Sequence, residues 1–216
     1  MNALRIELEH IKKSFAQPVL SDINLSVTNE TYLAILGKSG SGKSTLMNIL
    51  GLVENAESGR YVFNGIRIKK HGDYAALRRT QIGFIFQSYN LIPTLSCEEN
   101  IKLPLLYKGV RDDKRVKRLM DELDISVLAK QRVTTLSGGE KQRVAVARAL
   151  VLNPCFILAD EPTGNLDPKN RDILFSILRK EHENGRAILI ITHDESAAQN
   201  ARQRMLLEGG ILREIT

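Results

Sequence analysis

Residues 37–44 form a glycine-rich stretch, Gly37-Lys38-Ser39-Gly40-Ser41-Gly42-Lys43-Ser44. A short apolar run, Tyr32 to Leu36, precedes it, and a helical pattern, Ser44 to Leu52, follows it. The order of strand, glycine loop and helix is typical of α/β domains that hold a phosphate at a helix N-terminus, where backbone amides and the helix dipole favour an anion. The alternative is a glycine-rich turn with an incidental lysine, and the flanking strand and helix favour the phosphate loop.

The loop has the side chains that nucleotide binding needs. We expect Lys43 to reach the β- and γ-phosphates and Ser44 to give its hydroxyl to Mg²⁺. The residues predicted to contact ATP here are Gly37, Lys38, Ser39, Gly40, Ser41, Gly42, Lys43, Ser44 and Thr45. The loop therefore predicts ATP and Mg²⁺ as bound cofactors.

A second apolar run, Phe156 to Ala159, ends in two neighbouring acids, Asp160 and Glu161. Ligands of α/β sheets bind at the carboxyl ends of the strands, so both acids are expected near the phosphate loop. Asp160 is suited to hold Mg²⁺, directly or through water, and Glu161 is suited to act as the general base on the attacking water. The alternative is a solvated turn or helix start, because acids favour helix N-termini.

The rest of the chain supports the same α/β architecture. Alternation and short apolar runs predict strands, and apolar residues three and four apart predict helices. Strands are expected at Leu4–Leu8, Ile23–Val27, Ile82–Phe86, Ala187–Ile191 and near Leu206 and Ile211, and helices at Lys114–Leu123, Glu140–Leu152 and Arg171–His182. Strands that alternate with helices predict an α/β sandwich. Residues 88–153 hold only helical patterns, which predicts a helical subdomain inserted into a single domain of residues 1–216.

The composition is that of an ordinary globular domain. Of the 216 residues, 43% are hydrophobic and 26% are charged, which argues against disorder. No apolar run reaches bilayer-spanning length and no signal-peptide core opens the chain, so a cytosolic protein is expected. Cys97 and Cys155 lack metal-ligand spacing. The net charge of +6 fits nucleic acid, anionic lipid, nucleotide phosphates or a solvated basic surface.

A third motif lies between the phosphate loop and Asp160, namely Leu136-Ser137-Gly138-Gly139-Glu140-Lys141-Gln142-Arg143. A serine and two glycines that begin a helix can bind an anion. Ser137 with Glu140 also forms a capping-box pattern, and both interpretations can hold together. This stretch closely resembles the signature sequence of ATP-binding cassette (ABC) ATPases. The resemblance implies that Ser137, Gly138 and Gly139 contact the γ-phosphate held by a second subunit, so a dimer with another copy or a paralogue is expected.

Four more positions match landmarks of that family. The resemblance implies that Phe15 stacks on adenine, with core packing as the alternative. It implies that Gln87 contacts Mg²⁺ and links to a permease, and that Asp167 belongs to the loop Gly164-Asn165-Leu166-Asp167 that crosses the dimer interface. His193 matches the switch histidine that contacts the γ-phosphate, with a structural histidine as the alternative. The implied metal ligands are Ser44, Gln87 and Asp160, and the implied catalytic set is Lys43, Glu161 and His193.

The resemblance covers nearly the whole chain. It implies a P-loop ABC ATPase fold with a RecA-like core, a mixed and partly parallel central sheet, an antiparallel β subdomain and the inserted helical subdomain at about 88–153. No catalytic landmark is degenerate, so an active ATPase is expected. The segment from Ile82 to Tyr107 and the residue Asn165 look like the macrolide-exporter and lipoprotein-release (MacB and LolD) group. Cassettes of this group sit on the inner face of the cell membrane and drive a separate integral-membrane permease, in some cases with a periplasmic or extracellular adaptor.

Three functions follow from these patterns. The first expectation is an ATPase subunit for export of a peptide or antibiotic, or for lipoprotein release. The alternative is a complex that transmits motion and regulates cell-wall hydrolases without moving a substrate. A soluble ABC ATPase in cofactor assembly or nucleic-acid work is disfavoured, because the chain has one cassette and lacks inserted coiled-coil or zinc-binding segments. No nucleic-acid partner is therefore expected, and the chain leaves no room for a regulatory domain after the strand near Ile211.

Overall fold

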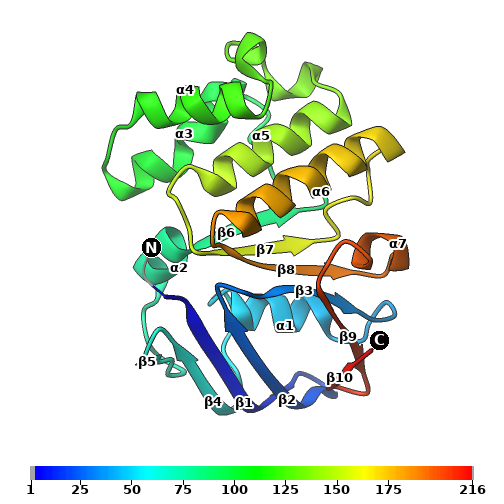
Figure 1. The fold of residues 1–216 in the computed structure, drawn as a ribbon. Coiled ribbons are helices and arrows are strands. Elements are labelled where there is room, and N and C mark those ends of the chain that lie inside the picture. Colours follow the sequence, from blue (N-terminus) through cyan, green and yellow to red (C-terminus); the bar gives the residue numbers. More distant parts are fainter. Residues whose placement is uncertain (1–2, 216) are drawn as a thin grey trace.

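The computed structural model describes residues 3–215, which form one mixed ten-stranded sheet with helices on both faces (Figure 1). The strands are β1 (Arg5–Ser14), β2 (Pro18–Thr28), β3 (Tyr32–Leu36), β4 (Ser58–Phe63), β5 (Ile66–Arg67), β6 (Ile82–Phe86), β7 (Phe156–Asp160), β8 (Ala187–Thr192), β9 (Gln203–Glu208) and β10 (Ile211–Glu214). The helices are α1 (Lys43–Leu50), α2 (Ala75–Gln81), α3 (Cys97–Lys108), α4 (Asp113–Glu122), α5 (Gly138–Leu150), α6 (Pro168–Glu183) and α7 (Glu195–Ala198), with 3-10 helices η1 (Ser126–Leu128) and η2 (Val133–Thr135). The predicted α/β fold is confirmed.

The parallel strands β3, β8, β7 and β6 form the centre of the molecule. Their uniformly apolar sequences are explained by burial on both faces, since successive side chains of a strand point to opposite sides. Ile188 and Ile190 of β8 pack in the core beneath α5 and α6, whereas Leu189 and Ile191 pack in the core that contains α1. All four strands end at one edge of the sheet, where the phosphate loop, Gln87, Glu161 and His193 directly follow the strand ends.

The remaining strands extend the sheet with mixed pairing, since β9 pairs parallel with β3 and β10 pairs parallel with β2. The sheet order is β5-β4-β1-β2-β10-β9-β3-β8-β7-β6. β1 pairs antiparallel with both β2 and β4, and the hairpin β9–β10 lies between β3 and β2. Helix α1 lies between this antiparallel part and the central strands (Figure 1). The mixed character of the sheet is thus confirmed together with its antiparallel portion.

Residues 88–153 carry α3, α4 and α5 together with η1 and η2. Helix α5 packs against the sheet, and α3 and α4 lie on its far side, at one end of the molecule (Figure 1). Helix α3 begins with a capping box between Ser96 and Glu99 and contains Pro104. A capping box satisfies two backbone amides at a helix start, which explains where α3 begins. Across the described residues 3–215, every helix is too short or too polar to cross a bilayer.

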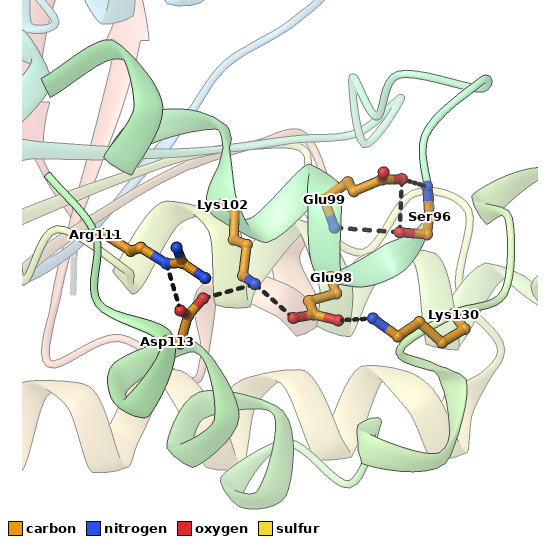
Figure 2. Close-up of polar contacts among 7 residues, drawn as sticks. All are labelled: Ser96, Glu98, Glu99, Lys102, Arg111, Asp113 and Lys130. Carbon is orange, nitrogen blue, oxygen red and sulfur yellow. Dashed lines mark hydrogen bonds and ion pairs between the residues drawn. The ribbon is translucent and has the colours of Figure 1, made fainter. Parts of the chain in front are cut away.

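A chain of ion pairs, here called the α3 network, ties α3 to its neighbours (Figure 2). The Glu98 carboxylate accepts from Lys102 at 2.5 Å and from Lys130 at 2.8 Å. Lys102 also reaches Asp113 at the start of α4, 2.7 Å away, and Asp113 accepts from Arg111. Linked charges of this kind stabilise an arrangement more than isolated surface pairs do, so the network fixes α3 against α4 and the loop after η1.

Candidate nucleotide site

A cleft of about 630 Å³ opens at the edge where the parallel strands end. Its walls come from five distant parts of the sequence, and the lining residues are Val19, Ser39, Gly40, Gly42, Lys43, Ser44, Thr45, Gln87, Asp160, Glu161 and His193. All of these except Val19 were predicted site residues. Parallel strands bring their carboxyl ends to one edge, which is why residues 37–45 and 160–161 meet here.

The glycine loop curls over the start of α1. Gly40 and Gly42 have φ of +80° and +99°, a region that favours glycine, and Gly42 is the N-cap of α1 without a side-chain cap. The Lys43 ammonium donates to the carbonyls of Gly37 at 2.7 Å and Lys38 at 3.0 Å. The uncapped amides, the helix dipole and the cation therefore face the same cleft, which is an arrangement suited to phosphate oxygens.

Glu161 is held at the cleft by both of its carboxylate oxygens. Thr192 donates its hydroxyl hydrogen to one oxygen at 2.9 Å, and His193 Nδ1 shares a hydrogen bond of 2.7 Å with the other. The side chain of Glu161 is only 15% exposed, whereas that of His193 is 69% exposed. Glu161 also has φ of +43°, an uncommon conformation for a residue with a side chain, which costs about 1–2 kcal/mol. These two contacts hold the carboxylate in one position at the cleft.

The neighbouring acid, Asp160, lies at the end of β7 and is half-buried. Burial raises the pKa of this carboxyl above its usual value, and the charge of Glu161 raises it further, while Lys43 acts in the opposite direction. A half-buried carboxylate with a raised pKa is stabilised by a divalent cation. Ser44, Gln87 and Asp160 offer hydroxyl, amide and carboxylate oxygens in one cleft, which are ligands that Mg²⁺ prefers. The residues present therefore fit the predicted metal.

The signature residues do not line this cleft. Ser137 caps α5 and forms the predicted capping box with Glu140. Gly139 packs closely against Asn170 of α6, whose backbone amide donates to Asp167 Oδ1 at 2.9 Å. Ser137, Gly138 and Asp167 thus form a second surface, called here the signature surface, on the same chain, and Gly139 is buried beside it against α6. Phe15 also lies outside the residues lining the cleft and is 63% exposed.

Some contacts at the site were not predicted from the sequence. The side-chain amide of Asn165 donates to the backbone carbonyl of Gln87 at 2.9 Å, and so joins two loops far apart in the chain. Arg148 of α5 donates to the carbonyls of Tyr89 at 2.7 Å and Asn90 at 2.5 Å. Tyr89 and Asn90 have positive φ angles of 60° and 49°. Arg148 lies among mostly buried residues of α5, and no sequence pattern marks it. Its contact with the loop after Gln87 is visible only in the structure.

A strand–loop–helix phosphate cradle with a fixed carboxylate opposite it defines the class of protein, a P-loop ATPase. The family model described as ABC transporter matches residues 20–164. The chain is 43% identical to an uncharacterised ABC transporter ATP-binding protein, YvrO, of Bacillus subtilis (strain 168), over 96% of this chain and 95% of that protein. This chain belongs to the ABC transporter family.

Other relatives are longer proteins. The chain is 39% identical to the macrolide export ATP-binding/permease protein MacB of Bdellovibrio bacteriovorus and covers 33% of it, so it spans about a third of that relative's length. Among solved structures, it superposes on the dimeric structure of MJ0796, a bacterial ABC transporter cassette, with a TM-score of 0.88 and 35% identity over 98% of both chains. A second structure of that cassette, in a post-hydrolysis state bound to ADP and Pi, also gives a TM-score of 0.88.

Proposed function

We propose that this chain hydrolyses ATP as one half of a dimer and drives a separate membrane permease. The observation that carries the proposal is Glu161, held by Thr192 and His193 in the cleft that also contains Lys43. The signature surface lies away from this cleft, so each cleft needs the signature surface of a second copy or a paralogue. The similarity to a dimeric cassette structure supports this arrangement.

In this mechanism the chain's residues act mainly by position and charge. Lys43 and the α1 amides bind the phosphates, and Glu161 orients water for attack on the γ-phosphorus while the bond to the β-phosphate oxygen breaks. His193 keeps Glu161 in place and lies near the transferred phosphoryl group. Ser44, Gln87 and Asp160 would hold Mg²⁺, which supplies charge neutralisation at the phosphates. Ser137 of the second copy bridges to the γ-phosphate, so hydrolysis releases the dimer.

A groove beside the site is suited to receive the permease. It measures about 520 Å³ and lies between α2, β6, α3 and α5, with Phe84, Phe86, Leu103 and Tyr107 among its lining residues. Tyr107 is 75% exposed and its neighbour Leu106 is 69% exposed, an unusual degree for large apolar side chains. Strand β6 forms part of the groove and leads directly into Gln87. A permease segment seated here would therefore sense movement of the glutamine loop.

The relatives named MacB favour an export complex, and we propose export of a peptide or antibiotic, or lipoprotein release, as the transported function. The second candidate is a complex that transmits motion to cell-wall hydrolases. The chain would then lie on the inner face of the cell membrane in either case, and an extracytoplasmic adaptor is an additional proposed partner. The outer domain of the permease distinguishes the two candidates.

The first experiment tests turnover and dimerisation. Glu161→Gln should bind ATP, lose ATPase activity by a factor of about 100 or more, and elute as a dimer with ATP and Mg²⁺, because general-base assistance is worth roughly 10²–10⁴ in rate. Glu208→Gln, an exposed change on β9, is the control and should turn over ATP like the wild type. An unchanged rate in Glu161→Gln would contradict the assigned role.

The second experiment identifies the partner. Tagged Glu161→Gln is captured from native membranes with ATP and Mg²⁺, and the bound proteins are identified by mass spectrometry. We expect a permease with few membrane spans and a large outer domain. Tyr107→Glu in the same background should lose this permease while keeping the ATP-dependent dimer. Recovery of soluble partners alone would refute the transporter assignment and leave the ATPase assignment intact.

A further inference from the structure

The Lys13 ammonium lies against the ring of Phe15. Its Nζ is 5.0 Å from the ring centroid, within the roughly 6 Å range of a cation–π contact. The Lys13 side chain is only 14% exposed, whereas Phe15 is 63% exposed. One face of the ring is thus covered by a cation, and much of the remaining ring surface is open to solvent.

Lys13 is itself held in place by two acceptors. Its Nζ donates to Glu54 Oε1 at 2.8 Å and to the carbonyl of Asn55 at 3.0 Å. The hydrogen bond from Lys13 lowers the pKa of the Glu54 carboxyl, as expected for an ionised pair. The backbone amide of Glu54 donates to Asn48 O at 3.1 Å, near the end of α1. Lys13 therefore connects the ring of Phe15 to the helix that begins at the phosphate loop.

Phe15 lies in the turn that leads to Val19 in one wall of the cleft. It occupies the turn between β1 and β2, where Ser14 pairs with Pro18, and the next residue, Val19, lines the cleft. A phenylalanine ring has no hydroxyl that could anchor it by a hydrogen bond. The orientation of this exposed ring therefore depends on the groups packed against it, and Lys13 is one that lies over its face.

We propose that Lys13 is a positioning residue for the nucleotide base. It holds the Phe15 ring from one face so that the opposite face stacks on adenine, and it has no contact with the nucleotide itself. This inference rests on the proposed function, in which ATP binds the cleft with its base on Phe15. The Lys13–Glu54 pair thereby fixes the position of the Phe15 ring relative to α1, the helix that begins at the phosphate loop.

The test is a double-mutant cycle between Lys13 and Phe15 in the full chain, with ADP and pyrophosphate as calorimetric probes. Lys13→Met should raise the Kd for ADP about twofold to fivefold, the range expected for an exposed cation–π contact. The Kd for pyrophosphate, which has no base, should stay unchanged. In ATPase assays KM should rise by a similar factor while kcat stays within about twofold. Lys12→Met, the adjacent exposed lysine, is the matched control and should leave the Kd for ADP unchanged.

In a Phe15→Ala background, Lys13→Met should have no further effect on ADP binding, and Lys13→Arg, which keeps the cation, should bind ADP like the wild type. An equal rise in the Kd for ADP with and without the Phe15 ring would overturn the proposal, as would an equal rise for pyrophosphate. Wild-type protein that bound neither ADP nor ATP would instead refute the proposed function. That result differs from a cycle in which the effects of the two substitutions simply add, which would refute only the role of Lys13.

Discussion

Replacing Gly139 by alanine should disrupt the contact between α5 and α6. A methyl group at Gly139 would lie 2.0 Å from Asn170 Oδ1, where ordinary contact begins at 3.4 Å, so Asn170 must retreat by about 1 Å or more. Asn170 at present donates through Nδ2 to Asp167 Oδ2 at 2.7 Å and accepts from Arg143 at 3.3 Å. The change should therefore break these two side-chain hydrogen bonds.

The magnitude follows from these contacts. Each hydrogen bond contributes roughly 1 kcal/mol, and each has one charged partner, Arg143 or Asp167. The better helix propensity of alanine offsets up to about 1 kcal/mol. Gly139→Ala should therefore lower the free energy of unfolding by about 1–2 kcal/mol, measured by urea denaturation at neutral pH. In an Asn170→Ala background the methyl group finds space, and the same substitution should become neutral or stabilising.

Equal destabilisation by Gly139→Ala with and without the Asn170 side chain would refute this reasoning. ATPase rates of the same variants add a second comparison. If activity returns in the double variant, Gly139 serves the packing of its own subunit. If stability returns and activity does not, the glycine is needed for close approach to a phosphate of the other subunit.

Two further predictions concern the helical region. Hydrogen bonds from Lys102, the larger cause, and from Lys130 lower the pKa of Glu98 below its ordinary 4.5. The Glu98 carboxylate therefore stabilises the fold above pH 4.5, and this stabilisation is lost as the pH falls through the lowered pKa. Glu98→Gln should therefore lower the free energy of unfolding by about 0.5–1 kcal/mol at neutral pH, and this loss should shrink as the pH falls through the lowered pKa, as measured by urea denaturation. Glu30→Gln, at an exposed position outside the network, is the control for the loss of one charge. Arg148→Met should raise amide hydrogen exchange in residues 88–91 about tenfold or more, because each bond from a charged donor is worth roughly 1.5–3 kcal/mol. Unchanged exchange in residues 88–91 would mean that Tyr89 and Asn90 keep their left-handed backbone conformation without Arg148.

The central strands could be predicted with accurate bounds. The expected strands Tyr32–Leu36 and Ile82–Phe86 coincide with β3 and β6. Strands buried on both faces are apolar throughout, so their ends coincide with the ends of the apolar run. β1 was expected at Leu4–Leu8 but continues to Ser14. Its register with β2 shifts after Leu8, and such a shift interrupts the alternation by which a half-buried strand is predicted.

Other elements left no periodic signal. Four short elements were not predicted, namely β4, β5, α2 and α7. The first half of β4 and the whole of β5 are exposed, so neither strand shows an alternation of buried and exposed residues. Helices α2 and α7 have at most two turns, which is too short for a helical repeat to be recognised. Helix α3 buries Ile101 and Leu105 but exposes Leu106 and Tyr107, so it lacks a clean apolar stripe.

The candidate site shows the same division. Residue types predicted Lys43, Asp160 and Glu161, and the sheet edge brings them together. The bond from Asn165 to Gln87 and the Lys13–Phe15 contact depend on tertiary structure that no local pattern encodes.

The position of the hairpin β9–β10 affects how the protein folds during synthesis. Residues 203–214 occupy the middle of the sheet, and Ile211 pairs with Asp22 while Gln203 pairs with Leu33. The strands on either side of this hairpin leave the ribosome about 170 to 190 residues earlier, yet they cannot join through the sheet until the hairpin arrives. Pairings of such sequence separation close slowly. The edges of β2 and β3 that face this hairpin therefore stay unpaired for most of synthesis, and those edges are where chaperones would be needed.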